Sequence, residues 1–266
     1  MRDWDWLRPH TLNLYEYVGN DPVNMWDPTG YMINGKRLTE EQRQSVLQEF
    51  STITGYNTGF QTDEEGNTQA TGLYFDDDGY LQIAEGAVAN SDGSTVAQDS
   101  LSAFIQDDLD VSLITADPRA PVQGEYFALA TAIPDHLSPS PDPSRPMNAT
   151  FIDFLDFSDK TNFVSKGVPE KAYGMGITLF HEFHHNFTGE GDPKNWQRVR
   201  DMGTVTGPAV DFANTIRGQL NLPLRAVYLP INHAGGWNEI FFKSPTTGQK
   251  VGSVLLNGRK MKPKPK

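Results

Sequence analysis

The chain has 266 residues, enough to form one large domain or two small ones around a sizeable core. Its net charge of −12 disfavours nucleic acid as the main partner, because the phosphate backbone would be repelled. The absence of cysteine excludes disulfides, thiolate metal sites and a cysteine nucleophile, so a metal would have to sit on histidine and carboxylate. The longest apolar runs are only a few residues, so no membrane insertion is expected.

Residues 12–31, LNLYEYVGNDPVNMWDPTGY, are rich in aromatic residues, Asn, Pro and Gly, which predicts short extended pieces and turns. Their order resembles the N-L-Y-x-Y-x-x-N-x-P-x-x-x-x-D-P-x-G signature that closes the core shell of Rhs/YD-repeat polymorphic toxins. The matching residues are Asn13, Leu14, Tyr15, Tyr17, Asn20, Pro22, Asp27, Pro28 and Gly30.

This resemblance implies that residues 1–31 are the end of the Rhs core and its cleavage boundary, and that residues 32–266 are the toxin domain. It also implies a secreted bacterial effector that is delivered into the target-cell cytoplasm. The partners implied are the Rhs shell of the parent chain and a cognate immunity protein. Within the toxin domain we expect an N-terminal α+β part, residues 32–147, and a zinc-binding catalytic part, residues 148–266.

Two helices are predicted in the N-terminal part of the toxin domain. The first spans residues 38–55, where Thr39 and Gln42 form a capping box and Gly55 provides the end. The second spans residues 94–109 and begins with a serine cap.

Short β-like runs lie between and after these helices. The aspartates at 76–78 are interpreted as a hairpin turn, because the full ligand spacing of a calcium loop is missing. Asp153 and Asp156 are expected to be solvated positions of an alternating strand, and the Pro/Ser-rich residues 134–146 to be a loop. The predicted strands are residues 72–75, 80–84, 111–116, 125–133 and 149–157.

Residues 168–187, VPEKAYGMGITLFHEFHHNF, are predicted to form the next helix. Pro169 suits its first turn and Gly189 its end. Gly174 and Gly176 each disfavour the helix by about 1 kcal/mol, so their presence suggests close packing against another backbone.

This helix carries the motif H-E-x-x-H, the arrangement of zincin metal sites. With about 100° of rotation per residue, His181 and His185 lie about 40° apart and can reach one cation. Glu182 flanks them, where it can contact a metal-bound water without binding the metal. His184 also neighbours His181, but that pair would face away from Glu182, so His184 is expected to pack or to hydrogen-bond outside the metal site.

Zinc needs a third protein ligand and one open position for water. Asp192 is the first choice, because it follows the helix across a glycine turn and keeps a G-x-x-D interval from Gly189. Asp211, at the head of a helix predicted over residues 207–220, is the second choice and Asp201 the third.

A second resemblance lies in residues 210–228, VDFANTIRGQLNLPLRAVY. They are similar to the N-x-x-R-x-x-L-x-L-P-x-R-x-x-Y stretch of effector-type zinc metallopeptidase domains on bacterial toxins, which implies a peptidase-like toxin tip. Tyr228 or Arg225 can stabilise an oxyanion, and Asn214 and Arg217 share a helix face from which they can orient a metal-binding carboxylate or a histidine. The matching residues are Asn214, Arg217, Leu220, Leu222, Pro223, Arg225 and Tyr228.

The residues together predict an α+β, zincin-like fold with an active-site helix, a small mixed sheet and a C-terminal helix plus strands. The expected function is a zinc-dependent metallopeptidase that hydrolyses peptide bonds in a protein or peptide substrate, with Glu182 as the base.

Three alternatives stay open. These are an HNH-like metal nuclease built on the HHN of residues 184–186, hydrolysis of a non-protein amide such as a peptidoglycan cross-bridge, and a binding module with a structural metal.

Overall fold

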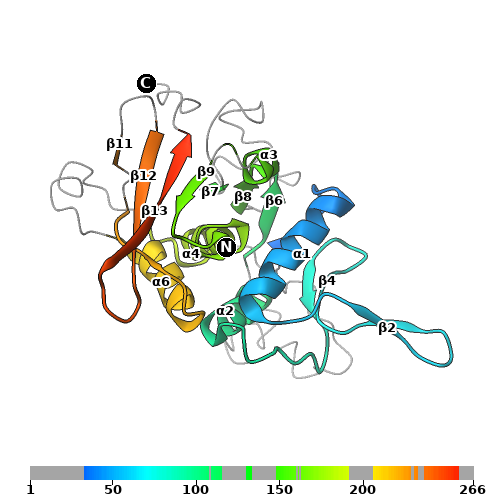
Figure 1. Ribbon diagram of the computed structural model, residues 1–266. Helices are drawn as coiled ribbons and strands as arrows, with labels where there is room; N and C mark the ends of the chain where they lie inside the picture. Colours follow the sequence, from blue (N-terminus) through cyan, green and yellow to red (C-terminus); the bar gives the residue numbers. More distant parts are fainter. Residues whose placement is uncertain are drawn as a thin grey trace, which may run out of the picture.

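The computed structural model describes residues 33–107, 109–115, 130–133, 148–159, 161, 163–191, 206–228, 231–232 and 237–257. Over these residues the architecture is α+β, as predicted, with five helices and several small sheets (Figure 1). The predictions for residues 1–31, for the loop 134–146 and for Asp192 and Asp201 fall outside the described residues. The helices are α1 (Glu40–Thr54), α2 (Thr95–Gln106), α3 (Phe154–Ser158), α4 (Met175–Thr188) and α6 (Pro208–Gln219), with a 3-10 turn η6 (Glu170–Ala172) before α4.

The first sheet is mixed and has four strands in the order β1-β6-β8-β7. Its parallel strands are β1 (Ile33–Asn34), β6 (Val111–Ile114) and β8 (Asn148–Ile152). β7 (Ala130–Ile133) runs antiparallel to β8 and is the last strand of this sheet in the described part of the chain.

The second sheet is antiparallel and comes from the C-terminal half. Its strands are β10 (Leu224–Arg225), β12 (Trp237–Lys243), β13 (Lys250–Asn257) and β9 (Phe163–Lys166), with β11 (Ile231–Asn232) also paired to β12. Two separate hairpins join β2 (Phe60–Thr62) to β3 (Thr68–Ala70) and β4 (Leu73–Phe75) to β5 (Leu81–Ile83). The second hairpin confirms the turn predicted at the three aspartates, where Asp76 Oδ1 accepts a hydrogen bond from Tyr80 N at 2.8 Å.

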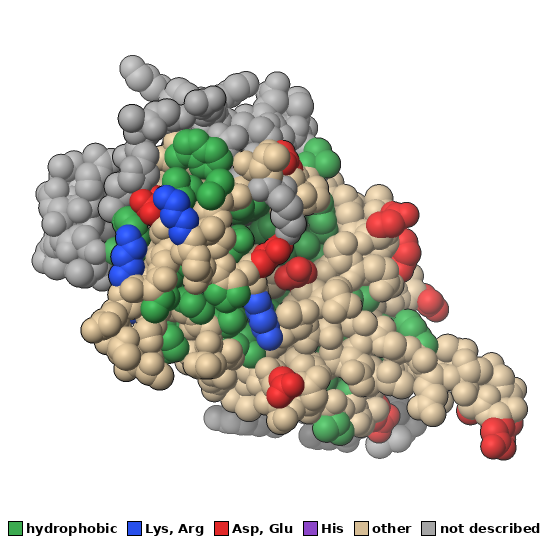
Figure 2. Space-filling view, viewed as in Figure 1, with side chains coloured by type: hydrophobic (Ala, Val, Ile, Leu, Met, Phe, Trp, Pro, Cys, Tyr) green, Lys and Arg blue, Asp and Glu red, His purple; other side chains and the backbone are tan. Residues whose placement is uncertain are grey.

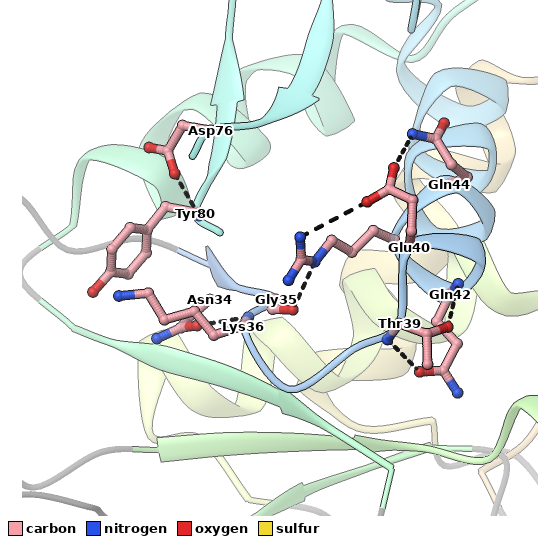
Figure 3. A network of polar contacts seen from close by, with 10 residues as sticks. Asn34, Gly35, Lys36, Thr39, Glu40, Gln42, Gln44, Asp76 and Tyr80 are labelled. Atoms are coloured by element: carbon pink, nitrogen blue, oxygen red, sulfur yellow. Dashed lines mark hydrogen bonds and ion pairs between the residues drawn. The ribbon is translucent and has the colours of Figure 1, made fainter. Parts of the chain in front are cut away.

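The start and end of α1 confirm the helix signals in the sequence. Gln42 N donates to Thr39 Oγ1 at 3.3 Å, and Thr39 N donates to Gln42 Oε1 at 2.9 Å, which completes the capping box (Figure 3). At the other end Gly55 adopts a left-handed φ of 80°, a conformation that favours glycine. Local chemistry therefore fixes both ends of this helix.

The prediction of one strand over residues 149–157 is wrong in its second half. β8 ends at Ile152, and Asp153 becomes the N-cap of α3, with its Oδ1 accepting a hydrogen bond from Asp156 N at 3.0 Å. Both aspartates are fully buried, not solvated as expected. The strand ends here because the short side chain of Asp153 accepts a hydrogen bond from a nearby backbone N–H. This local bond favours the start of a helix over continued strand pairing.

The predicted start of the histidine-bearing helix is also wrong. Pro169 precedes the short turn η6, and α4 begins only at Met175, with Gly174 as its N-cap in an extended conformation. The end is as predicted, because Gly189 takes a left-handed φ of 69° and closes the helix. Gly174 is therefore a boundary residue, and only Gly176 lies inside the helix.

One hydrophobic core joins α1, α2, α4 and α6. At its centre the fully buried ring of Phe50 lies 5.5 Å from Phe180 and 5.8 Å from Phe183, measured between ring centroids. Figure 1 shows α4 in the middle of the molecule, with α6 and the β12–β13 hairpin on one side and α1 on the other. None of the helices described here has the length and apolar content to span a bilayer.

The close approach of α4 to α1 depends on Gly176. A Cβ atom at this position would lie 2.8 Å from Ile53 Cγ1 and 2.9 Å from Glu49 O. In addition, Gly176 N donates to Glu49 Oε2 at 2.9 Å. The expectation of close backbone packing is thus confirmed for this glycine.

We predict that Gly176→Ala lowers the free energy of unfolding by about 1–3 kcal/mol, because the added methyl group overpacks the α1–α4 contact. The matched control is Gly218→Ala in α6, where the nearest atom to an added Cβ is Leu224 Cδ2 at 3.9 Å. That variant should be neutral or more stable, by up to about 1 kcal/mol of helix propensity. Chemical denaturation of both variants checks this, and equal effects would contradict it.

Candidate active site

Helix α4 brings His181, Glu182 and His185 together. The rings of His181 and His185 lie 4.9 Å apart between centroids and are nearly perpendicular, at 89°. Glu182 Oε1 lies 4.0 Å from His181 Nε2, and the two side chains are only 12% and 13% exposed. The helical spacing therefore places two imidazoles and one carboxylate in a largely enclosed space, as the motif predicts.

The ring of His185 is oriented by the chain that follows the helix. The left-handed turn at Gly189 leads to Glu190, whose backbone oxygen lies 2.5 Å from His185 Nδ1. Because a carbonyl oxygen can only accept, Nδ1 carries a proton, and the neutral form of the ring would hold its lone pair on Nε2, a buried atom. A carbonyl on the far nitrogen is the usual second partner of a metal-binding histidine.

His184 lies on another side of the helix. Its ring stacks on Phe212 of α6, at 4.9 Å and 22°, and its Nε2 lies 2.9 Å from Glu190 Oε2. His184 thus packs and hydrogen-bonds, as expected. Glu190 contacts both histidines, a role that sequence analysis missed, although its place directly after the helix-ending glycine was a usable signal.

Glu182 is held by the edge of the first sheet. Its Oε2 accepts a hydrogen bond from Ala132 N in β7 at 2.8 Å. This bond orients the carboxylate so that Oε1 is the oxygen nearer to His181. The contact was invisible in the sequence because the two residues are fifty positions apart.

A cavity of about 250 Å³ opens beside His181 and Glu182, and His185 is not among the residues that line it. It brings His181 and Glu182 together with Arg225 and Tyr228, the two residues predicted to stabilise an oxyanion. Most of the remaining wall is apolar, which is typical of ligand pockets. The other lining residues are Ala130, Phe163, Tyr173, Ile177, Thr178, Val210, Arg217, Asn238, Ile240, Phe242, Val254 and Leu256.

Asn214 has a different role from the predicted one. Its Oδ1 accepts hydrogen bonds from Arg225 N at 2.8 Å and from Arg217 Nη1 at 3.1 Å, and its Nδ2 donates to Arg225 O at 2.9 Å. It therefore fixes β10 to α6 and does not orient a histidine or a carboxylate among the described residues. Arg225 in turn donates from Nε to Val227 O at 3.1 Å and from Nη2 to Tyr228 O.

The described residues fit part of a zinc site. Imidazole groups are ligands that suit Zn²⁺, and His185 already has the carbonyl partner that such ligands use. No group of three candidate ligands gathers within the described ranges. Asp211 is exposed in the first turn of α6, where it accepts a hydrogen bond from the Thr206 hydroxyl. Asp192, the first choice for the third ligand, lies outside those ranges.

Comparison with known proteins gives no match to a family model, to a curated protein or to a solved structure.

Proposed function

We propose that the chain is a zinc-dependent metallopeptidase of zincin-like fold, with His181 and His185 as metal ligands and Asp192 as the third. The observation that carries the proposal is the position of the Glu182 carboxylate, which faces the same cavity as His181 and is fixed by the sheet edge. The proposed setting is the toxin tip of an Rhs/YD-repeat protein that acts in a target cell. An active-site helix beside a mixed sheet supports the zincin-like arrangement.

Peptide is the favoured substrate because of the strand next to Glu182. β7 is the last strand of its sheet in the described part of the chain, and Ala130 lines the cavity. An extended peptide can pair with such an edge through its own backbone groups. Because the Ala132 N–H already donates to Glu182, a peptide would pair with the rest of β7, which would place it beside that carboxylate.

The chemistry then follows from the side chains. When bound, Zn²⁺ lowers the pKa of water toward about 7 and polarises a carbonyl group. Glu182 takes a proton from the attacking water and delivers it to the leaving nitrogen. Because Arg225 donates from Nε and Nη2 to backbone carbonyls, Tyr228 is the favoured donor to the oxyanion.

The alternatives are less well supported. A nuclease needs a broad basic surface, whereas Figure 2 shows Lys and Arg side chains only at scattered positions on the visible face, and acidic side chains at the tip of the β2–β3 hairpin. A purely structural metal needs no adjoining cavity, yet one of about 250 Å³ borders His181.

Removal of the metal tests the proposal. We predict that the chain cleaves a denatured protein, that a chelator stops the cleavage, and that added Zn²⁺ restores it, because the attacking water is activated only with the metal in place. Gel analysis of the fragments, with a metal assay in parallel, would check this. Cleavage that persists in chelator, or cleavage of nucleic acid instead, would contradict it.

A further inference from the structure

Arg217 is a buried cation in the wall of the cavity. It belongs to α6 and is only 5% exposed. Its Nε donates to Ala172 O at 2.7 Å and its Nη1 to Asn214 Oδ1 at 3.1 Å, and its Cζ lies 5.9 Å from the centre of the Phe242 ring. All three partners are neutral, so they hold the guanidinium in place without compensating its charge.

No carboxylate pairs with Arg217 among the residues that the structure describes. Burial and the neighbouring Arg225 lower the pKa of Arg217 to about 9, so the group remains protonated at neutral pH. Arginine is almost never fully buried unless it is paired, because an uncompensated buried charge is costly. Among the described residues, two guanidinium groups and one carboxylate, Glu182, line this cavity, so these side chains carry a net positive charge in a chain of net charge −12.

We propose that this cavity is a specificity pocket for a carboxylate group of the substrate, with Arg217 as the specificity-determining residue. The apolar wall, which includes Ile240, Val254 and Leu256, suits an aliphatic stem, and the guanidinium suits the charged end. A glutamate side chain near the scissile bond has this chemistry. The free C-terminal carboxylate of a peptide offers the same group from a second source.

The selectivity must arise by local contact. A net charge of −12 repels acidic substrates at long range, so only a carboxylate that enters the pocket can benefit from Arg217. The pocket adjoins Glu182, and its assignment to a substrate therefore rests on the proposed peptidase function.

The first experiment measures kcat/KM for pairs of peptides that are identical except for Glu or Gln at one position. That position is moved step by step along both sides of the cleaved bond. In the first set of peptides both ends are chemically blocked, and in the second set the C-terminus is free. At one position Glu should be favoured over Gln by about ten- to a hundredfold, the range of a charge-assisted hydrogen bond. Preference only in the free C-terminus set would assign the pocket to the terminal carboxylate. Equal rates throughout both sets would overturn the proposal.

The second experiment measures binding without turnover. Zinc-loaded Glu182→Gln protein is titrated with acetyl-glutamate amide and with acetyl-glutamine amide, and NMR reports the affinities. The glutamate compound should bind at least about tenfold more tightly. Arg217→Gln on this background should equalise the two, whereas Arg217→Lys should keep part of the difference. If Arg217→Gln binds the glutamate compound with unchanged affinity, the carboxylate of that compound binds the metal and not Arg217. This result would overturn the proposal.

A matched pair of variants covers the case in which Arg217→Gln fails to fold. Ile240→Glu puts a carboxylate into the cavity wall, and Ile240→Gln adds the same shape without charge. Only Ile240→Glu should abolish the preference for the glutamate compound, and an intact preference would count against the pocket.

The two proposals can fail separately. Binding of the glutamate compound that depends on Arg217, without any peptide cleavage, would refute the peptidase function alone. Peptide cleavage without a preference for Glu would refute the pocket alone.

Discussion

Glu182→Gln is expected to keep zinc bound and to lower kcat/KM for peptide cleavage by about 10²- to 10⁴-fold, the usual contribution of a general base. The structure makes this substitution conservative in shape. The amide oxygen of Gln can still accept the hydrogen bond from Ala132 N, which leaves the NH₂ group in place of Oε1. That NH₂ group cannot accept a proton, whereas His181 and His185 are untouched.

The measurement compares zinc per chain and kcat/KM in the variant and in the unmodified chain. Glu64→Gln is the control, because it makes the same chemical change at the exposed β2–β3 hairpin. Its activity should remain near normal. If Glu182→Gln stays active, or loses its zinc, then Glu182 is not the base.

The second large effect concerns the third zinc ligand. Asp192→Ala should weaken zinc binding by more than about a hundredfold. Removing a residue that hydrogen-bonds to a metal ligand already weakens metal binding by up to about a hundredfold, and removing the ligand itself should weaken it more. Support comes from the turn at Gly189, which returns the chain so that Glu190 O already reaches His185, two residues before Asp192. Asp211→Ala should keep its zinc, since Asp211 is exposed and accepts a hydrogen bond from Thr206.

The amount of zinc that remains bound after dialysis is measured for both variants, and it decides which aspartate is the ligand. Stoichiometric zinc in Asp192→Ala together with metal-free Asp211→Ala would reverse the assignment and place the third ligand on α6. Zinc retained by both variants would point to Asp201, the remaining candidate, whose own alanine variant would then have to lose the metal.

Features that depend on neighbouring residues could be predicted from the sequence. Thr39 with Gln42 begins α1 and Gly189 ends α4, because capping and left-handed turns involve residues only a few positions apart. The meeting of His181 and His185 on one helix face follows from the same short-range geometry.

Features that depend on distant segments could not be predicted. The bond from Ala132 to Glu182 spans fifty positions, and the bond from Arg217 to Ala172 spans forty-five. Nothing in the local pattern of α6 shows that Arg217 would be buried without a carboxylate partner among the described residues. The strand predicted over residues 149–157 failed for another reason, since the apolar spacing there suits a strand while Asp153 caps a helix.

The position of β1 would limit where the proposed release from an Rhs precursor could occur. Ile33 is fully buried and pairs with Val111, and Asn34 pairs with Ser112, so these two residues complete the parallel side of the first sheet. A cut on the C-terminal side of Asn34 would strip this strand from the sheet and uncover the apolar side chains beneath it. If the proposed processing occurs, a cut that leaves the folded domain intact would have to fall before residue 33.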